Sequence, residues 1–135
     1  MITGLIAPLL TPFDDNLALD QEKFNAHAQR LLDTGCAGLA PFGTTGEALS
    51  ISHRERKAAL EGLVAAGIDP IVMIPGTGLC NLPDTVDLCQ HAINLGCAGV
   101  MTLPPFYFKG MSGAGLYDYF VRLVDMVNDN RLKIY

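Results

Sequence analysis

The sequence predicts an α/β protein, namely the N-terminal half of a parallel (β/α)8 or TIM barrel, with about four βα units and the start of a fifth strand. Three observations support this. Short apolar runs alternate with amphipathic segments, glycines recur at similar intervals, and segments rich in hydroxyl groups and glycine follow the apolar runs. A closed barrel of this kind has about 250 residues, whereas the chain has 135. We therefore expect residues 1–135 to form a single unit, half of a barrel.

The apolar runs are expected to be buried strands. Polar and apolar residues do not alternate in them, which is typical of strands covered on both faces in a parallel sheet. The runs are Leu5–Leu10, Ala37–Phe42, Ile71–Ile74, Gly99–Leu103 and a segment that begins at Leu132.

The segments between these runs have the periodicity of amphipathic helices. Asp20 is suited to cap the first helix, and Ser52 with Glu55 forms a capping box for the second. Pro83 fits the first turn of the third helix, and Ser112 fits the N-cap of the fourth. The expected buried faces are Phe24, Ala28, Leu31 and Leu32 in the first helix, Val86, Cys89 and Ile93 in the third, and Leu116, Phe120, Leu123, Val124 and Val127 in the fourth.

Glycines close the helical segments at a regular interval. Gly35, Gly67 and Gly96 lie 32 and 29 residues apart, each where a left-handed residue is expected after a helix. A period of roughly thirty residues indicates successive βα units. A doubly wound open sheet is the alternative, and it is less favoured because no glycine-rich dinucleotide-binding turn follows the first strand.

Composition excludes several classes of function. The net charge of -5 and the pI of about 4.9 disfavour a nucleic-acid partner. No apolar run is long enough to span a membrane, and the N-terminus lacks the basic start of a signal peptide, so we expect a cytoplasmic protein. The four cysteines, Cys36, Cys80, Cys89 and Cys97, have neither C-x-x-C nor zinc spacing, which predicts free, buried thiols and no metal site.

The most informative segment is Gly43-Thr44-Thr45-Gly46-Glu47, between an apolar run and a helix start. In parallel barrels, ligands bind where strands end. Two glycines permit close approach of the backbone to a ligand, and the hydroxyls and amides could hold a small carboxylate. Glu47 is expected to act structurally, as a charge that favours the start of the next helix.

Three further segments follow strands at the same level: Thr11-Pro12-Phe13, Gly76-Thr77-Gly78 and Pro105-Phe106-Tyr107. Gly76–Gly78 either lines the site or only forms the exit of its strand. The four segments together resemble the signature of the dihydrodipicolinate synthase / N-acetylneuraminate lyase family of class I aldolases, in that family's order and spacing. Cys80 and Phe106 replace an asparagine and a tyrosine common in the synthases, so the resemblance indicates the family rather than the lysine-pathway synthase.

The resemblance implies a Schiff base between a lysine and pyruvate or another 2-oxo acid, whose enamine adds to, or is released from, an aldehyde. It implies a homo-oligomer, a dimer of dimers, and no dissociable cofactor. By the same resemblance, Thr45 and the neighbouring backbone of Gly43 and Gly46 bind the carboxylate. Thr44 passes protons, and Tyr107 completes the relay in the partner subunit.

The resemblance places the Schiff-base lysine on a sixth strand, outside this chain. None of the lysines present takes that role, and Tyr135 is left unassigned; the lysines are Lys23, Lys57, Lys109 and Lys133. An alternative is a non-catalytic half-barrel fragment whose edge strands favour self-association. A phosphate cradle at Gly43–Glu47 is less favoured, because no P-loop lysine accompanies it. The identity of the aldehyde stays open.

Overall fold

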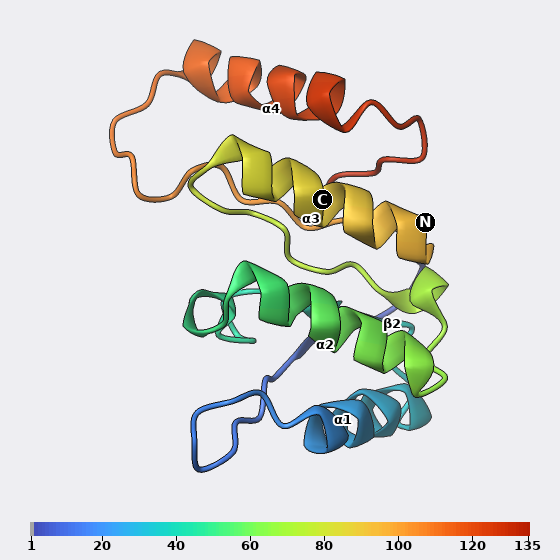
Figure 1. The fold of residues 1–135 in the computed structure, drawn as a ribbon. Helices are drawn as coiled ribbons and strands as arrows, with labels where there is room; N and C mark the ends of the chain where they lie inside the picture. The colour runs from blue at the N-terminus through green and yellow to red at the C-terminus, as the bar shows by residue number, and fades with distance from the viewer. Residues whose placement is uncertain (1) are drawn as a thin grey trace.

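The structure is a computed structural model that describes residues 2–135. A layer of four helices, in chain order from α1 to α4, covers one side of a set of parallel strands (Figure 1). The elements are β1 Ile6–Leu9, α1 Gln21–Asp33, β2 Gly38–Pro41, α2 His53–Ala65, α3 Leu82–Leu95 and α4 Gly113–Val127, with short 3-10 turns η1 Ala48–Ser50 and η2 Pro70–Val72.

The order of the strands distinguishes a half-barrel from a doubly wound sheet. β1 pairs with β2 in parallel, with Ile6 opposite Gly38. The pairing then continues through isolated parallel bridges, from Leu39 to Met73, from Gly76 to Met101 and from Val100 to Ile134. Each strand segment thus lies beside the next one along the chain, as in a β/α barrel. In a doubly wound sheet, the order of the strands would reverse at the switch point.

The third predicted strand, Ile71–Ile74, is partly wrong. Its first two residues belong to the 3-10 turn η2, and Ile71 is 56% exposed. The Asp69 side chain accepts a hydrogen bond from the Ile71 amide at 3.0 Å, and Pro70 fixes the first position of the turn. The strand is therefore reduced to the residues around the Met73 bridge, and Gly99–Leu103 is likewise reduced to bridges at Val100 and Met101.

The predicted helix ends are confirmed. The Asp20 side chain accepts from the Lys23 amide, and Ser52 and Glu55 form both bonds of a capping box. Pro83 lies in the first turn of α3, and the Ser112 side chain caps α4. Gly35, Gly67 and Gly96 have φ angles of +98°, +95° and +91°, so all three adopt the left-handed conformation that ends a helix.

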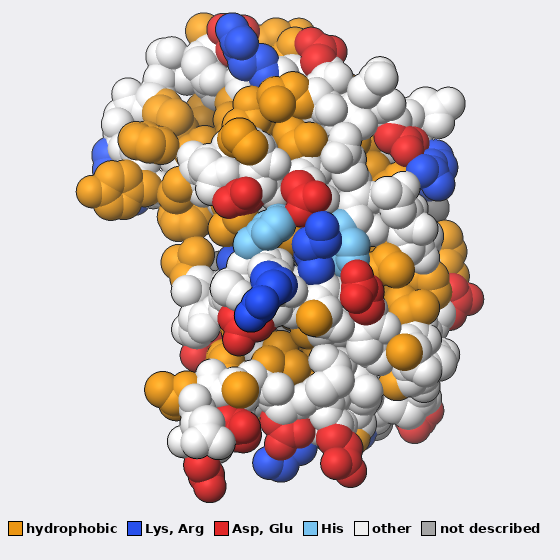
Figure 2. Space-filling model, in the orientation of Figure 1, with side chains coloured by type: hydrophobic (Ala, Val, Ile, Leu, Met, Phe, Trp, Pro, Cys, Tyr) orange, Lys and Arg blue, Asp and Glu red, His pale blue; other side chains and the backbone are white. Residues whose placement is uncertain are grey.

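The core lies between the helices and the strands. Its largest fully buried side chains include Phe24, Leu39, Leu63, Met73 and Leu123. Val124, expected on the buried face of α4, is instead 49% exposed. Among the described elements, α4 packs chiefly against α3, and hydrophobic side chains remain visible over this end of the molecule (Figure 2).

The four cysteines are free, as predicted. Only Cys89, on α3, is buried, and the other three are half-buried, so the expectation of buried thiols was too general. Burial raises the pKa of the Cys97 thiol to about 12. Within residues 2–135, no helix has the length and hydropathy needed to cross a bilayer.

Candidate carboxylate-binding site

The loop Gly43–Glu47 leaves β2 in an unusual backbone conformation. Phe42, directly before it, has a φ of +61°, and Glu47, at its end, has a φ of +51°. Left-handed backbone costs about 1–3 kcal/mol at a residue other than glycine and is concentrated at ligand sites. Phe42 is anchored because its buried ring stacks on Phe24, with ring centroids 5.7 Å apart.

Two glycines let the strand exits pack together. A Cβ atom on Gly46 would lie 2.5 Å from the carbonyl oxygen of Leu9. A Cβ on Gly76 would overlap the carbonyl oxygen of Phe42. Close backbone packing at both positions therefore requires glycine.

Two hydrogen bonds fix carbonyl groups of the loop. The Thr11 hydroxyl donates to the Gly46 carbonyl at 2.6 Å, and the Ala48 amide donates to the Gly43 carbonyl at 3.3 Å. The amides of Thr44, Thr45 and Gly46 have no acceptor among residues 2–135. Consecutive free amides form a concave anion-binding surface.

The loop borders a cavity of about 490 Å³. Thr44 and Thr45 are exposed, and their hydroxyls have no hydrogen-bond partner within the described part of the chain. Among the described residues that line the cavity, Glu47 is the only charged one. The lining comprises Pro8, Ala40, Phe42, Gly43, Thr44, Thr45, Glu47, Ala48, Leu49, Gly76, Gly78, Met101, Leu103 and Phe106. An apolar cavity with a few polar groups at one point is typical of a small-molecule site.

Glu47 does not have the role expected from the sequence. It precedes the short turn η1 rather than α2, and its side chain makes no capping hydrogen bond. Ser52 caps α2 instead, while Glu47 lines the cavity. The left-handed backbone at Glu47 separates the loop from the helix start.

Tyr107 is not brought together with Thr44. It is 77% exposed and absent from the cavity lining, and its ring meets Phe108 edge-on with centroids 5.7 Å apart. Its predicted role in a partner subunit requires an outward position, and this role stays a prediction.

Gly76 and Gly78 both line the cavity, so this segment does more than form the exit of its strand. Thr77, between them, is 2% exposed, and its Oγ1 lies 2.7 Å from Thr102 Oγ1. The Cys89 thiol donates to the same Thr77 oxygen at 3.3 Å. This buried polar contact between neighbouring strand exits was missed, although Thr102 within one apolar run and Thr77 shortly after another could have indicated it.

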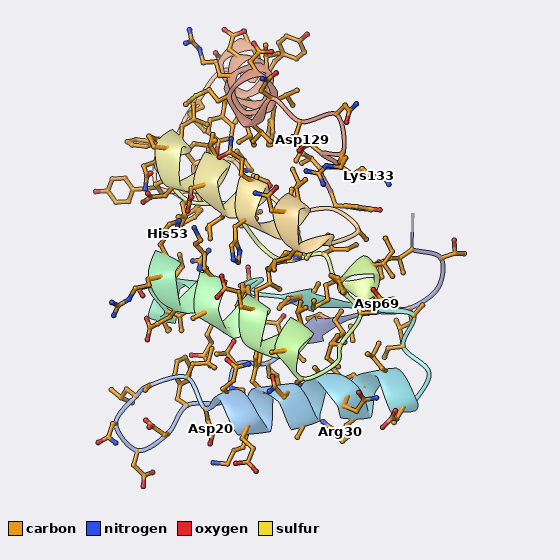
Figure 3. All side chains as sticks on the ribbon, turned by 45° about the vertical axis from the view of Figure 1, so that its right-hand side comes forward. Asp20, Arg30, His53, Asp69, Asp129 and Lys133 are labelled. Atoms are coloured by element: carbon orange, nitrogen blue, oxygen red, sulfur yellow. The ribbon has the colours of Figure 1, made fainter. Side chains whose placement is uncertain are left out.

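None of the lysines in the described chain lines the cavity. Lys57 on α2 pairs with Asp87 on α3 at 3.0 Å, and His53 lies 2.7 Å from the same carboxylate. Charged and histidine side chains gather at the centre of the face that Figure 2 shows. Lys109 donates to the Phe106 carbonyl. Lys133 lies at the end of the molecule opposite the start of α1, which Asp20 marks (Figure 3). Residues 2–135 also contain no cluster of side chains suited to bind a metal ion.

Parallel strands in chain order, covered by helices and carrying a ligand cavity where the strands end, define one half of a β/α barrel. The whole chain, residues 1–135, matches the model of the dihydrodipicolinate synthetase family and belongs to that family.

Relatives of known name agree with this assignment. The 4-hydroxy-tetrahydrodipicolinate synthase of Brucella suis is 35% identical over 128 residues, which cover 95% of this chain and 43% of the relative. The crystal structure of dihydrodipicolinate synthase from Agrobacterium tumefaciens superposes with a TM-score of 0.92 at 36% identity, covering 98% of this chain and 47% of that one. The E. coli prophage protein YagE, solved in complex with pyruvate, superposes with a TM-score of 0.86 at 31% identity, covering 99% and 44%. The chain thus spans less than half the length of these relatives.

Proposed function

We propose that this chain supplies the 2-oxo-acid-binding half of a Schiff-base aldolase, lyase or synthase. The observation that carries the proposal is the run of free amides at Thr44, Thr45 and Gly46, together with the two exposed hydroxyls of Thr44 and Thr45, which line an apolar cavity. A relative with 31% identity was solved with pyruvate, and pyruvate has the carboxylate that such a loop would bind.

In the proposed reaction, Thr45 and the amides from Gly43 to Gly46 hold the carboxylate. A lysine outside this chain attacks the C2 carbonyl, and the C2 oxygen leaves as water, which gives an iminium ion. Loss of a proton from C3 gives the enamine, whose electron pair attacks the aldehyde carbon in the synthetic direction. In the lyase direction, the C3–C4 bond breaks and its electron pair returns to the iminium ion.

The protons would move through Thr44. Its hydroxyl can accept a proton and donate another at the same oxygen, as a relay requires. Tyr107 of a second subunit would complete the relay, since Tyr107 of the same chain is exposed and does not line the cavity. The proposal therefore includes a homo-oligomer, and it needs no dissociable cofactor.

Reductive trapping tests the proposal. Residues 1–135 are joined at the fifth strand to the C-terminal half of the Agrobacterium tumefaciens relative, and the chimera is incubated with pyruvate and borohydride. We expect mass spectrometry to find one lysine that carries reduced pyruvate, and less of this adduct in Thr45→Val at low pyruvate concentration. A folded chimera without any adduct would show that the Schiff-base assignment is wrong.

The second candidate is a non-catalytic half-barrel that self-associates. The favouring observation is the exposure of Leu5, Leu10 and Leu103, which are 69%, 51% and 52% exposed. β1 also has a pairing partner on one side only within the described chain, and such edges promote association. Sedimentation of the 135-residue chain distinguishes the candidates, because a monodisperse monomer that binds pyruvate contradicts the purely associative one.

A further inference from the structure

Arg56 is the one buried arginine in the described chain, and neither the family resemblance nor the proposed mechanism uses it. It lies near the start of α2 and is 2% exposed. One of its nitrogens, Nη2, donates to the Ala48 carbonyl at 2.5 Å. Nε and Nη1 are buried without a hydrogen-bond partner among residues 2–135.

The charge of Arg56 is not neutralised by a carboxylate of the described chain. No ion pair within residues 2–135 includes Arg56, whereas Lys23, Lys57 and Arg131 each pair with an aspartate. Burial lowers the pKa of the Arg56 guanidinium, but arginine stays protonated in proteins. A buried, unpaired cation is costly, and it favours a nearby anion when one binds.

Ala48 links Arg56 to the loop. The Ala48 carbonyl accepts from Arg56, and the Ala48 amide donates to the Gly43 carbonyl at 3.3 Å. This second bond closes a turn around Thr44, Thr45, Gly46 and Glu47. Ala48 itself lines the cavity, so the guanidinium is one hydrogen bond away from a residue of the cavity wall.

We propose that Arg56 is a positioning residue for the carboxylate-binding loop: it holds Ala48, and through Ala48 the turn Gly43–Glu47, and it places a positive charge behind the free amides. This inference rests on the proposed binding of a 2-oxo acid. The positioning role of Arg56 requires both the hydrogen bond to Ala48 and the charge. If Arg56 were purely structural, its replacement would change the stability of the fold but not the affinity of the folded chain for pyruvate.

The test is the affinity of the 135-residue chain for pyruvate, followed by the NMR shifts of the Thr44, Thr45 and Gly46 amides. We expect Arg56→Met to weaken binding about tenfold, since hydrogen bonds to charged groups contribute on that scale. Arg56→Lys, which keeps the charge, should recover most of the affinity. Arg54→Met removes an exposed arginine from the same helix and should change the affinity less than about twofold.

The variants separate positioning from folding. If Arg56→Met unfolds, Arg56→Gln takes its place in the test. Its amide can still donate to Ala48 but lacks the charge, so the loss of pyruvate affinity should be measurable but smaller than that expected for Arg56→Met. Unchanged pyruvate affinity in a folded Arg56→Met or Arg56→Gln would overturn the role of Arg56. Failure of the unaltered chain to bind pyruvate would instead contradict the proposed carboxylate site, and with it the basis of this inference, whereas reductive trapping in the chimera tests the Schiff-base assignment separately.

Discussion

Replacing Gly46 by alanine should destabilise the fold at the candidate site. The new Cβ would lie 2.5 Å from the Leu9 carbonyl oxygen and 3.2 Å from the Phe42 nitrogen. Both are backbone atoms, so no side-chain rotation can relieve the contact and the loop must move. Overpacking of this kind costs ~1–3 kcal/mol, and loss of the 2.6 Å bond from Thr11 to the Gly46 carbonyl adds ~1 kcal/mol. We therefore expect the free energy of unfolding to fall by ~2–4 kcal/mol.

Urea denaturation of the 135-residue chain measures this change, with Gly113→Ala as the control. A Cβ at Gly113 would meet nothing within 4 Å, and Gly113 lies at the start of α4. The control should be neutral or stabilising by up to ~1 kcal/mol. A Gly46→Ala chain within ~0.5 kcal/mol of the unaltered one would refute the close packing of the two strand exits.

Three further predictions concern other contacts. Thr11→Val keeps the shape of the side chain but removes the donor to Gly46, so the unfolding free energy should drop by ~1–2 kcal/mol in urea titrations, and an unchanged value would count against this bond. The pKa of Asp87 is lowered, mainly by its hydrogen bond from Lys57. The ionised carboxylate should therefore stabilise the folded chain above pH ~4, and this stabilisation should disappear as the pH falls through the lowered pKa. The acid-unfolding profile of Asp87→Asn should lack this pH-dependent loss. Because burial raises the pKa of the Cys97 thiol to about 12, the reactive thiolate is scarce near neutral pH. Iodoacetamide should therefore label Cys97 faster in urea than in the folded chain, and equal labelling would contradict the raised pKa.

Local signals made parts of the fold predictable. The capping box of Ser52 and Glu55 depends on residues three positions apart, and the glycine ends of helices depend on one backbone angle. The family resemblance likewise rested on short contiguous segments. Each of these features depends on residues that are close together in the chain, so the sequence was sufficient to predict them.

Features set by tertiary packing were less predictable. Ile71 belongs to an apolar run, but Asp69 and Pro70 begin a 3-10 turn there. The hydropathy of the run does not predict this turn. Glu47 precedes a helix in sequence, but its left-handed backbone directs it to the cavity rather than to the α2 terminus.

The burial of Arg56 also depends on tertiary packing and was not predicted from the sequence. Its burial depends on how the loop after β2 returns against α2, and an arginine in a polar helix segment otherwise resembles a surface residue. Its hydrogen bond to Ala48 joins positions eight residues apart, across a turn that no periodicity describes.

The most direct test of the central claim is to map where pyruvate binds on the isotopically labelled chain. We expect saturable shifts of the Thr44, Thr45 and Gly46 amides, which have no acceptor within residues 2–135, and little change on the outer faces of α1 and α4. The same experiment in Gly46→Ala should show weaker binding. Shifts that are absent, or that centre on residues away from Gly43–Glu47, would contradict the assignment of this loop as the carboxylate-binding site.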